Sequence, residues 1–231
     1  MLKTLAMLML LGTCAAPGAR AQTPPTPAEI SAYGGLHAAA AKGNLGDISR
    51  LLREGAEIDA RDRNGRTALH VAAFQGHGSA AQALIKSGAN STLLDNQRYD
   101  AVTIVSVRND VPTLQSLLAA GASASLVTSI YDGTALIAAA HLGHDEIVRE
   151  LIRAGAPLDH VNNLHWTALI EAVILGDGGP RHIETVRALV RAGADKSIAD
   201  RDGVTPLQHA RARGYAVIAK LIEDGESSRS K

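Results

Sequence analysis

Aromatic residues are scarce in this sequence. Phe, Trp and Tyr make up 3% of its 231 residues, whereas 46% of the residues are hydrophobic. Aromatic rings bury large areas and usually dominate protein cores. Their scarcity leaves Ala, Leu, Ile and Val to fill the interior. The composition therefore predicts a thin core in which backbones approach closely.

Net charge and cysteine are nearly absent as well. The 23 Lys and Arg residues balance 23 Asp and Glu residues, and the one cysteine is Cys14. Without a basic excess, the chain lacks the electrostatic signature of nucleic-acid binding or of adhesion to anionic membranes. A single cysteine excludes a framework of intramolecular disulfides. We therefore expect no nucleic-acid partner.

The first 21 residues have the features of a secretory signal peptide. Lys3 supplies a positive charge, an apolar run follows from Leu5 to Leu11, and Ala19-Arg20-Ala21 provides small residues around the cleavage point. We expect cleavage after Ala21 and no membrane insertion of the mature chain. Residues 22–29 are rich in proline and are predicted to form an extended linker.

Cys14 lies within this signal peptide. Its removal would leave a mature chain without a thiolate for metal binding or catalysis. An alternative stays open, because Leu11-Gly12-Thr13-Cys14 resembles a bacterial lipoprotein box, so that Cys14 would carry a lipid anchor.

Two markers repeat along the rest of the chain at intervals of about 33 residues. The first is a Gly-Ala pair, whose copies are separated by 33, 33, 34 and 38 residues. The second is a Thr-x-Leu motif or its variant, which keeps the same register. A fixed period of this length indicates a stack of structural repeats. The Gly-Ala pairs begin at Gly55, Gly88, Gly121, Gly155 and Gly193, and the Thr motifs at Thr67, Thr134, Thr167 and Thr205.

These motifs resemble the ankyrin repeat, whose pattern runs Asp-x-x-Gly-x-Thr-Pro-Leu-His, then Ala-Ala-x-x-Gly-His, then Gly-Ala. The copy over 62–90 matches most completely, whereas the third copy replaces the Gly-x-Thr turn by Tyr99-Asp100-Ala101. The resemblance implies an all-α solenoid of stacked helix-turn-helix repeats with β-turn fingers. It covers residues 30–225 as six repeats, at about 30–60, 61–91, 92–123, 124–159, 160–196 and 197–225, and leaves 226–231 as a polar tail.

Local signals agree with such repeats. Thr at an N-cap can accept a hydrogen bond from a free N–H, and Pro206 suits the first turn of a helix. Gly76, Gly143 and Gly176 are expected to end the first helix of their repeats in a left-handed conformation. Helices of about ten residues are unstable alone in water, so the repeats must stack.

The fifth repeat carries an insertion of five residues within Gly176–Arg181. Two interpretations stay open, because insertions in solenoids often lie on a binding face but are also tolerated at the surface at little entropic cost. The segment lacks the Gly-Lys-Ser/Thr of a phosphate-binding loop.

No catalytic motif is present in the sequence. There is no Gly-x-Ser-x-Gly elbow and no His-x-x-x-His or His-Glu-x-x-His pair. The resemblance implies structural roles for five of the nine histidines. We expect a non-enzymatic protein with no catalytic residue, no metal and no cofactor. The alternative is a metal-dependent envelope enzyme that uses His141, His160, His165 and Asp177. The five histidines with implied structural roles are His37, His70, His77, His144 and His182.

In ankyrin proteins, partners are usually bound by the fingers and by the residues between Ala-Ala and Gly-His. At these offsets lie four of the six aromatic residues, with aliphatic and Arg side chains between them. That composition is typical of a binding hot spot, although such side chains also pack finger against finger. The predicted partner-binding residues are Arg63, Arg66, Phe74, Gln75, Gln97, Tyr99, Arg108, Ile130, Tyr131, His141, Leu142, Leu164, Trp166, Ile174 and Leu175.

The sequence thus predicts a monomeric, non-catalytic protein-binding module of the bacterial periplasm, which binds another protein through its concave finger face. It is similar to exported periplasmic ankyrin proteins, and that resemblance implies support of oxidative-stress protection linked to catalase. An immunity or inhibitor protein that neutralises a toxin in the envelope is the alternative.

Overall fold

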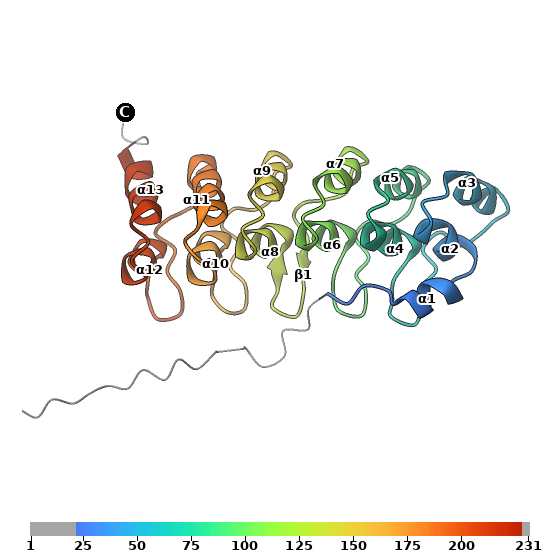
Figure 1. The fold of residues 1–231 in the computed structure, drawn as a ribbon, viewed down its shortest axis with the longest axis horizontal. Coiled ribbons are helices and arrows are strands. Elements are labelled where there is room, and N and C mark those ends of the chain that lie inside the picture. Colours follow the sequence, from blue (N-terminus) through green and yellow to red (C-terminus); the bar gives the residue numbers. More distant parts are fainter. Residues whose placement is uncertain (1–21, 228–231) are drawn as a thin grey trace, which may run out of the picture.

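A computed structural model describes residues 22–227; the predicted signal peptide and most of the predicted polar tail lie outside these residues. Thirteen helices are described, of which twelve form six antiparallel pairs that stack in chain order in one row (Figure 1). The predicted all-α solenoid is confirmed.

Each pair contributes one helix to each of two layers. The inner layer lies beside the fingers, and the outer layer lies on the far side of the core (Figure 1). The inner helices are α2 (Gly35–Ala41), α4 (Ala68–Gln75), α6 (Ala101–Val107), α8 (Ala135–His141), α10 (Ala168–Ile174) and α12 (Pro206–Ala212). The outer helices are α3 (Leu45–Arg53), α5 (Gly78–Lys86), α7 (Val111–Ala119), α9 (Asp145–Arg153), α11 (Pro180–Ala192) and α13 (Ala216–Ser227).

Side-chain caps start the inner helices as predicted. The hydroxyl oxygens of Thr134 and Thr167 accept hydrogen bonds from backbone N–H groups at 3.3 Å. In the third repeat the carboxylate of Asp100 does the same, 2.9 Å from Thr103 N. The departure from the repeat pattern at this position therefore preserves the cap.

Glycine ends the inner helices in two ways. Gly76 adopts φ 73° after α4, in the left-handed region predicted for it. Gly176 is not among the positive-φ residues, so that expectation was wrong for the fifth repeat. Glycine is needed there because a Cβ would collide with the carbonyl oxygen of Ala172.

Aliphatic side chains from the outer helices fill the space between the two layers. Leu84, Leu117, Leu151 and Leu189 recur at one position of the repeat and are fully buried. Alanines such as Ala72 and Ala139 are also fully buried, and they allow neighbouring inner helices to approach closely. This confirms the thin aliphatic core predicted from the composition.

The fingers form a continuous row below the inner helices. In the fourth repeat, β1 (Val127–Thr128) pairs antiparallel with β2 (Gly133–Thr134). Backbone hydrogen bonds join neighbouring fingers: Ser129 N donates to Arg98 O at 2.7 Å, and Asn163 N donates to Tyr131 O at 2.9 Å. The fingers and inner helices together make the finger-side face of the molecule.

Residues 22–32, which we call the strap, cross this face before the first repeat (Figure 1). The strap contains an extended stretch and the short helix α1 (Pro27–Ala32), which begins at a capping box formed by Thr26 and Glu29. The segment predicted as an extended linker is therefore extended in part, forms a short helix, and is held against the protein. Within residues 22–227, no helix has the length and apolar character needed to cross a bilayer.

Candidate interaction surface

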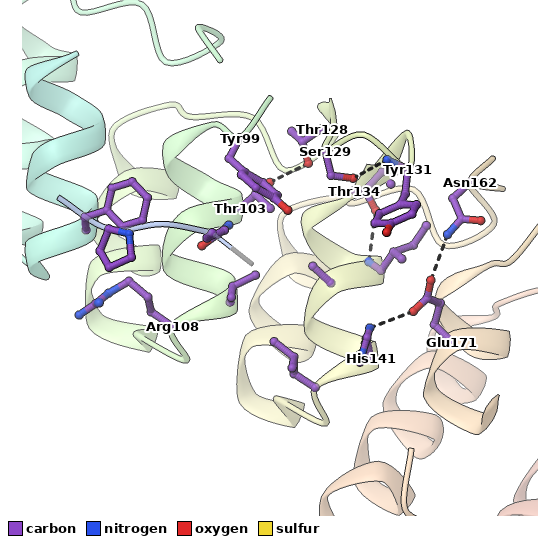
Figure 2. Close-up of a pocket in the computed structure, with 18 residues that line it drawn as sticks. Tyr99, Thr103, Arg108, Thr128, Ser129, Tyr131, Thr134, His141, Asn162 and Glu171 are labelled. Atoms are coloured by element: carbon purple, nitrogen blue, oxygen red, sulfur yellow. Dashed lines mark hydrogen bonds and ion pairs between the residues drawn. The ribbon is translucent and has the colours of Figure 1, made fainter. Parts of the chain in front are cut away.

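A pocket of about 510 Å³ opens on the finger-side face between the third and fifth repeats. Its walls come from α6, α8, the adjoining fingers and one residue each of α4 and α10 (Figure 2). Gln22 and Pro24 of the strap border one end. Its apolar walls are formed mainly by Phe74, Tyr99, Val107, Tyr131, Ile137 and Leu142.

A carboxylate lies at the end of the pocket away from the strap. Glu171 on α10 has a side chain that is only 6% exposed. Its Oε1 accepts a hydrogen bond from Asn162 Nδ2 at 3.0 Å, and its Oε2 lies 3.3 Å from His141 Nδ1 (Figure 2). Asn162 Oδ1 in turn accepts from the backbone N–H groups of Leu164 and Trp166, both at 3.0 Å. Glu171 is thereby fixed to the finger of its own repeat.

The opposite end of the pocket carries positive charge. Arg108 is exposed at the end of α6, near the strap (Figure 2). Burial, with the nearby negative charge of Asp95 adding to it, raises the pKa of Tyr99, which therefore stays neutral at physiological pH. The pocket thus offers apolar walls between a basic rim and an acidic end.

The strap binds the finger-side face through its backbone. Arg66 Nη2 donates to the carbonyl oxygen of Thr23 at 2.7 Å, and Thr23 N donates to Gln97 Oε1 at 2.9 Å. Gln97 Nε2 also donates to the Thr23 hydroxyl at 3.3 Å. These contacts hold an extended, proline-containing chain across the second and third repeats.

Glu29 anchors the other end of the strap. Its carboxylate accepts hydrogen bonds from Arg63 at 3.0 Å and from Asn64 at 2.7 Å. The backbone N–H of Thr26, followed by the Arg63 guanidinium, lowers the pKa of Glu29 to about 2. The ionised form of this side chain therefore favours the bound strap.

Two predicted surface residues are buried below the strap. Arg66 and Phe74 are each only 3% exposed, and the guanidinium lies 5.6 Å from the ring centroid. Phe74 belongs to the buried hydrophobic core, and Tyr99 packs against that core. The two rings predicted to contact a partner therefore also contribute to the interior of the stack. Arg63 and Gln97, also predicted to contact a partner, contact the strap here.

The structure brings the predicted residues of the third and fourth repeats together. Tyr99, Arg108, Tyr131, His141 and Leu142 all line the pocket. Beside it, aliphatic side chains stand in solvent, with Ile130 as much as 50% exposed. Their role in binding stays a prediction. The other predicted residues lie outside the pocket lining: Ile130, Leu164 and Leu175 are exposed, and Gln75, Trp166 and Ile174 are partly exposed.

Sequence reasoning missed the acidic end of the pocket. Glu171 lies four residues after the capping Thr167, where other repeats carry Val71, Ile104 and Ala138. The sixth repeat carries His209 at this position, so the available signal was a carboxylate where the second, third and fourth repeats are apolar. Pocket lining by Thr103, Thr128 and Ile137 depends on the fold and had no separate signal.

The repeat histidines bridge neighbouring repeats as the resemblance implied. His70 Nε2 lies 3.1 Å from Tyr99 O, and His37 Nε2 lies 2.9 Å from Arg66 O. The equivalent contacts of His77, His144 and His182 reach carbonyl oxygens of the preceding repeat at 3.0–3.1 Å. These five side chains are therefore engaged in holding the stack.

The residues of the alternative metal site contact different partners. His160 Nε2 lies 2.6 Å from Asp132 O, and Asp177 Oδ1 lies 2.8 Å from His182 Nδ1. His141 pairs with Glu171 instead. Among residues 22–227, no group of three or more His, Cys, Asp and Glu side chains converges as a metal ion would need.

The insertion of the fifth repeat contacts the sixth. Tyr215 OH donates to Gly176 O at 3.0 Å, and a Cβ on Gly178 would meet the same ring. Hydrogen bonds from Gly179 N, and then from His182, lower the pKa of Asp177. None of Gly176–Arg181 lines the pocket.

The chain belongs to the ankyrin-repeat family. The family model described as "Ankyrin repeats (3 copies)" matches residues 36–123 and 101–200. The ankyrin repeat protein YahD of Escherichia coli (strain K12) is 38% identical over 93 residues, which are 40% of this chain and 46% of that protein. The chain spans less than half of the length of the curated relatives that it matches.

Solved structures of other ankyrin-repeat proteins resemble this fold. An ankyrin repeat domain from Acinetobacter baumannii AYE is 44% identical with a TM-score of 0.77, over 83% of this chain and 97% of that one. The ankyrin repeat protein EF0377 is 31% identical with a TM-score of 0.76, over 82% and 96%. Ankyrin repeats are protein–protein interaction modules, and the fold is generally a non-enzymatic scaffold.

Proposed function

We propose that this protein is a non-catalytic binding module that captures another protein on the finger-side face, over the pocket between its third and fifth repeats. The observation that carries the proposal is the pocket itself, whose apolar and aromatic walls adjoin exposed aliphatic side chains. Exposed apolar surface of this kind is typical of protein-binding sites. The strap reaches the pocket only with Gln22 and Pro24. The proposed binding surface therefore begins at Tyr99 and extends toward the fifth repeat.

Capture of the native partner tests this proposal. The double variant Tyr131→Ala, Leu142→Ala removes two walls of the pocket, and we expect it to weaken capture by cross-linking in intact cells at least tenfold. The matched control is Leu45→Ala, because Leu45 is also exposed but lies at the start of the outer helix α3. Unchanged capture by the double variant, with thermal unfolding preserved, would refute the site.

We also propose that the module works in the bacterial periplasm as a monomer. The signal-peptide features of residues 1–21 support export. The intact mass of the protein purified from the envelope is expected to equal that of a chain that begins at Gln22. A mass that includes a lipid on Cys14 would instead establish the anchored form, and recovery of uncleaved chain in the cytoplasm would contradict export.

Within the periplasm, we propose a role in protection against peroxide that is linked to catalase. Only the resemblance to exported ankyrin proteins supports this step. A deletion strain is expected to survive peroxide less well than its parent, and to recover when the gene is restored. Normal peroxide survival, together with sensitivity to a toxin encoded beside the gene, would favour an immunity protein instead.

A further inference from the structure

We propose that the pocket binds an extended segment of the partner that presents a lysine or arginine side chain to the carboxylate of Glu171. This inference rests on the proposed function and names the chemistry that the partner brings to the same surface.

The fold does not require a carboxylate at position 171. The equivalent positions of the second and third repeats hold Val71 and Ile104, both fully buried, and the fourth holds Ala138. Placing a carboxylate in such a position costs free energy unless hydrogen bonds or an opposite charge compensate. The fifth repeat thus departs from the second, third and fourth repeats, whereas the sixth places His209 at this position. The departure in the fifth repeat puts negative charge into the pocket.

The neighbouring finger is adapted to this charge. Other fingers use an aspartate to hold the turn, for example Asp62 and Asp95, but the fifth uses Asn162. An asparagine avoids a second negative charge and donates a hydrogen bond to Glu171. The sixth repeat joins the same two positions with the carboxylate on the finger: Asp200 lies 2.7 Å from Nε2 of His209, which is the equivalent of Glu171.

The carboxylate still has capacity for a ligand. Asn162 contacts Oε1 and His141 contacts Oε2, and each carboxylate oxygen can accept a further hydrogen bond. His141 is half-exposed and lines the pocket together with Glu171. An ammonium or guanidinium group entering the pocket would therefore meet a nearly buried carboxylate, where an ion pair is stronger than at an exposed site.

The walls suit the stem of a basic side chain. Tyr99, Tyr131 and Leu142 line the pocket together with Glu171, and they can cover the methylene groups of lysine or arginine. Tyrosine faces also attract cations. The guanidinium of the lining belongs to Arg108, which stands at the opposite end (Figure 2).

The strap indicates the conformation of the ligand. It runs over the finger-side face as an extended chain, with Pro24 and Pro25 favouring that conformation. The side chains of Arg66 and Gln97 bind its backbone at Thr23. Its residue Gln22 borders the pocket, so a partner segment that lies extended on this face beyond Gln22 would place a side chain near Glu171.

Peptide pools test this inference on the full mature chain. The probes are N-acetylated, C-amidated hexapeptides of Ser and Pro with one central residue fixed as Lys, Arg, Leu, Glu or acetyl-lysine. Fluorescence of Trp166, the sole tryptophan, which neighbours Asn162, reports binding. We expect the Lys and Arg pools to bind about tenfold more tightly than the Leu and Glu pools, as for a hydrogen-bonded charge pair.

Glu171→Gln is expected to remove this preference, since the amide keeps a hydrogen-bond acceptor for Asn162 but loses the charge. Glu150→Gln is the matched control: Glu150 is a shielded glutamate on the outer helix α9, bonded to Gln115 and Arg153. The acetyl-lysine pool removes the charge from the ligand instead, so it decides the question even where Glu171→Gln fails to fold. We expect it to bind no better than the Leu pool.

Equal binding of all pools, or a basic preference that persists in Glu171→Gln, would overturn the inference. The proposed function has a separate readout, which is capture of the native partner by the Tyr131→Ala, Leu142→Ala variant. Capture that depends on those two walls but not on Glu171 would leave the proposed function standing and remove only the basic ligand.

Discussion

The finger-side face has two halves, which are built from the same repeat but differ in what contacts them. Over the second and third repeats, the strap bonds to Arg66, whose guanidinium lies over the buried ring of Phe74, and to the side chain of Gln97. Between the third and fifth repeats, a pocket remains with aromatic walls and a carboxylate at its end. The repeat therefore fixes where side chains can be presented, while a few substitutions decide which half of the face the strap occupies and which half carries the pocket proposed to bind a partner.

The covered half should behave as core when it is mutated. Phe74→Ala is expected to lower the free energy of unfolding by about 3–5 kcal/mol, because it empties a buried site below the strap. Urea unfolding measures this loss. Tyr131→Ala, which cuts back a partly exposed ring of the open half, should cost far less stability. Equal losses for the two variants would break the comparison.

The open half should behave as a binding surface. We expect Tyr131→Ala to weaken partner binding by about 2 kcal/mol, as for an interface anchor. Titration calorimetry with the identified partner measures this change. Arg63→Ala is the comparison on the covered half, since Arg63 is exposed but bonds to Glu29, and its effect on partner affinity should be small. A larger effect of Arg63→Ala would place the partner over the strap.

Asn162→Asp tests whether a second negative charge is tolerated at the acidic end of the pocket. The change places a second carboxylate beside Glu171, and removes the donor that bonds it. We expect a loss of about 1–2 kcal/mol in the free energy of unfolding at pH 7, measured by urea unfolding. Asn44→Asp is the matched control at an exposed N-cap, because Asn44 also donates to a carboxylate, that of Asp47 at 2.7 Å. Water screens the new pair of charges there, so the loss of stability should be smaller.

The smallest expected effect concerns the anchor of the strap. The folded pKa of Glu29 is about 2, below its ordinary 4.5, so its stabilising contribution is present above pH 4.5 and is lost as the pH falls toward 2. Glu29→Gln should cost less than about 1 kcal/mol at pH 7, and this difference from wild type should shrink over that pH range. A difference independent of pH would mean that the charge of Glu29 does not hold the strap.

Local signals made the repeats predictable. The Thr and Asp caps, the bridging histidines such as His70, and the buried leucines such as Leu117 each act within one repeat or between neighbours. Such contacts recur with the period of the sequence, so the pattern reveals them. The position of the strap was not predictable in this way. The contact between Thr23 and Gln97 joins residues 74 apart and does not recur with the repeat.

The sequence by itself determined the six-repeat solenoid, because short helices with fixed caps and one apolar stripe can bury that stripe only by stacking on their neighbours. Only the tertiary structure decided which candidate surface residues face solvent. It buried Arg66 where the strap bonds to it, with Phe74 against the guanidinium, and it brought Tyr99, Tyr131 and Glu171 from three repeats into one pocket. Burial depends on what covers a position, and the cover here comes from a distant part of the chain.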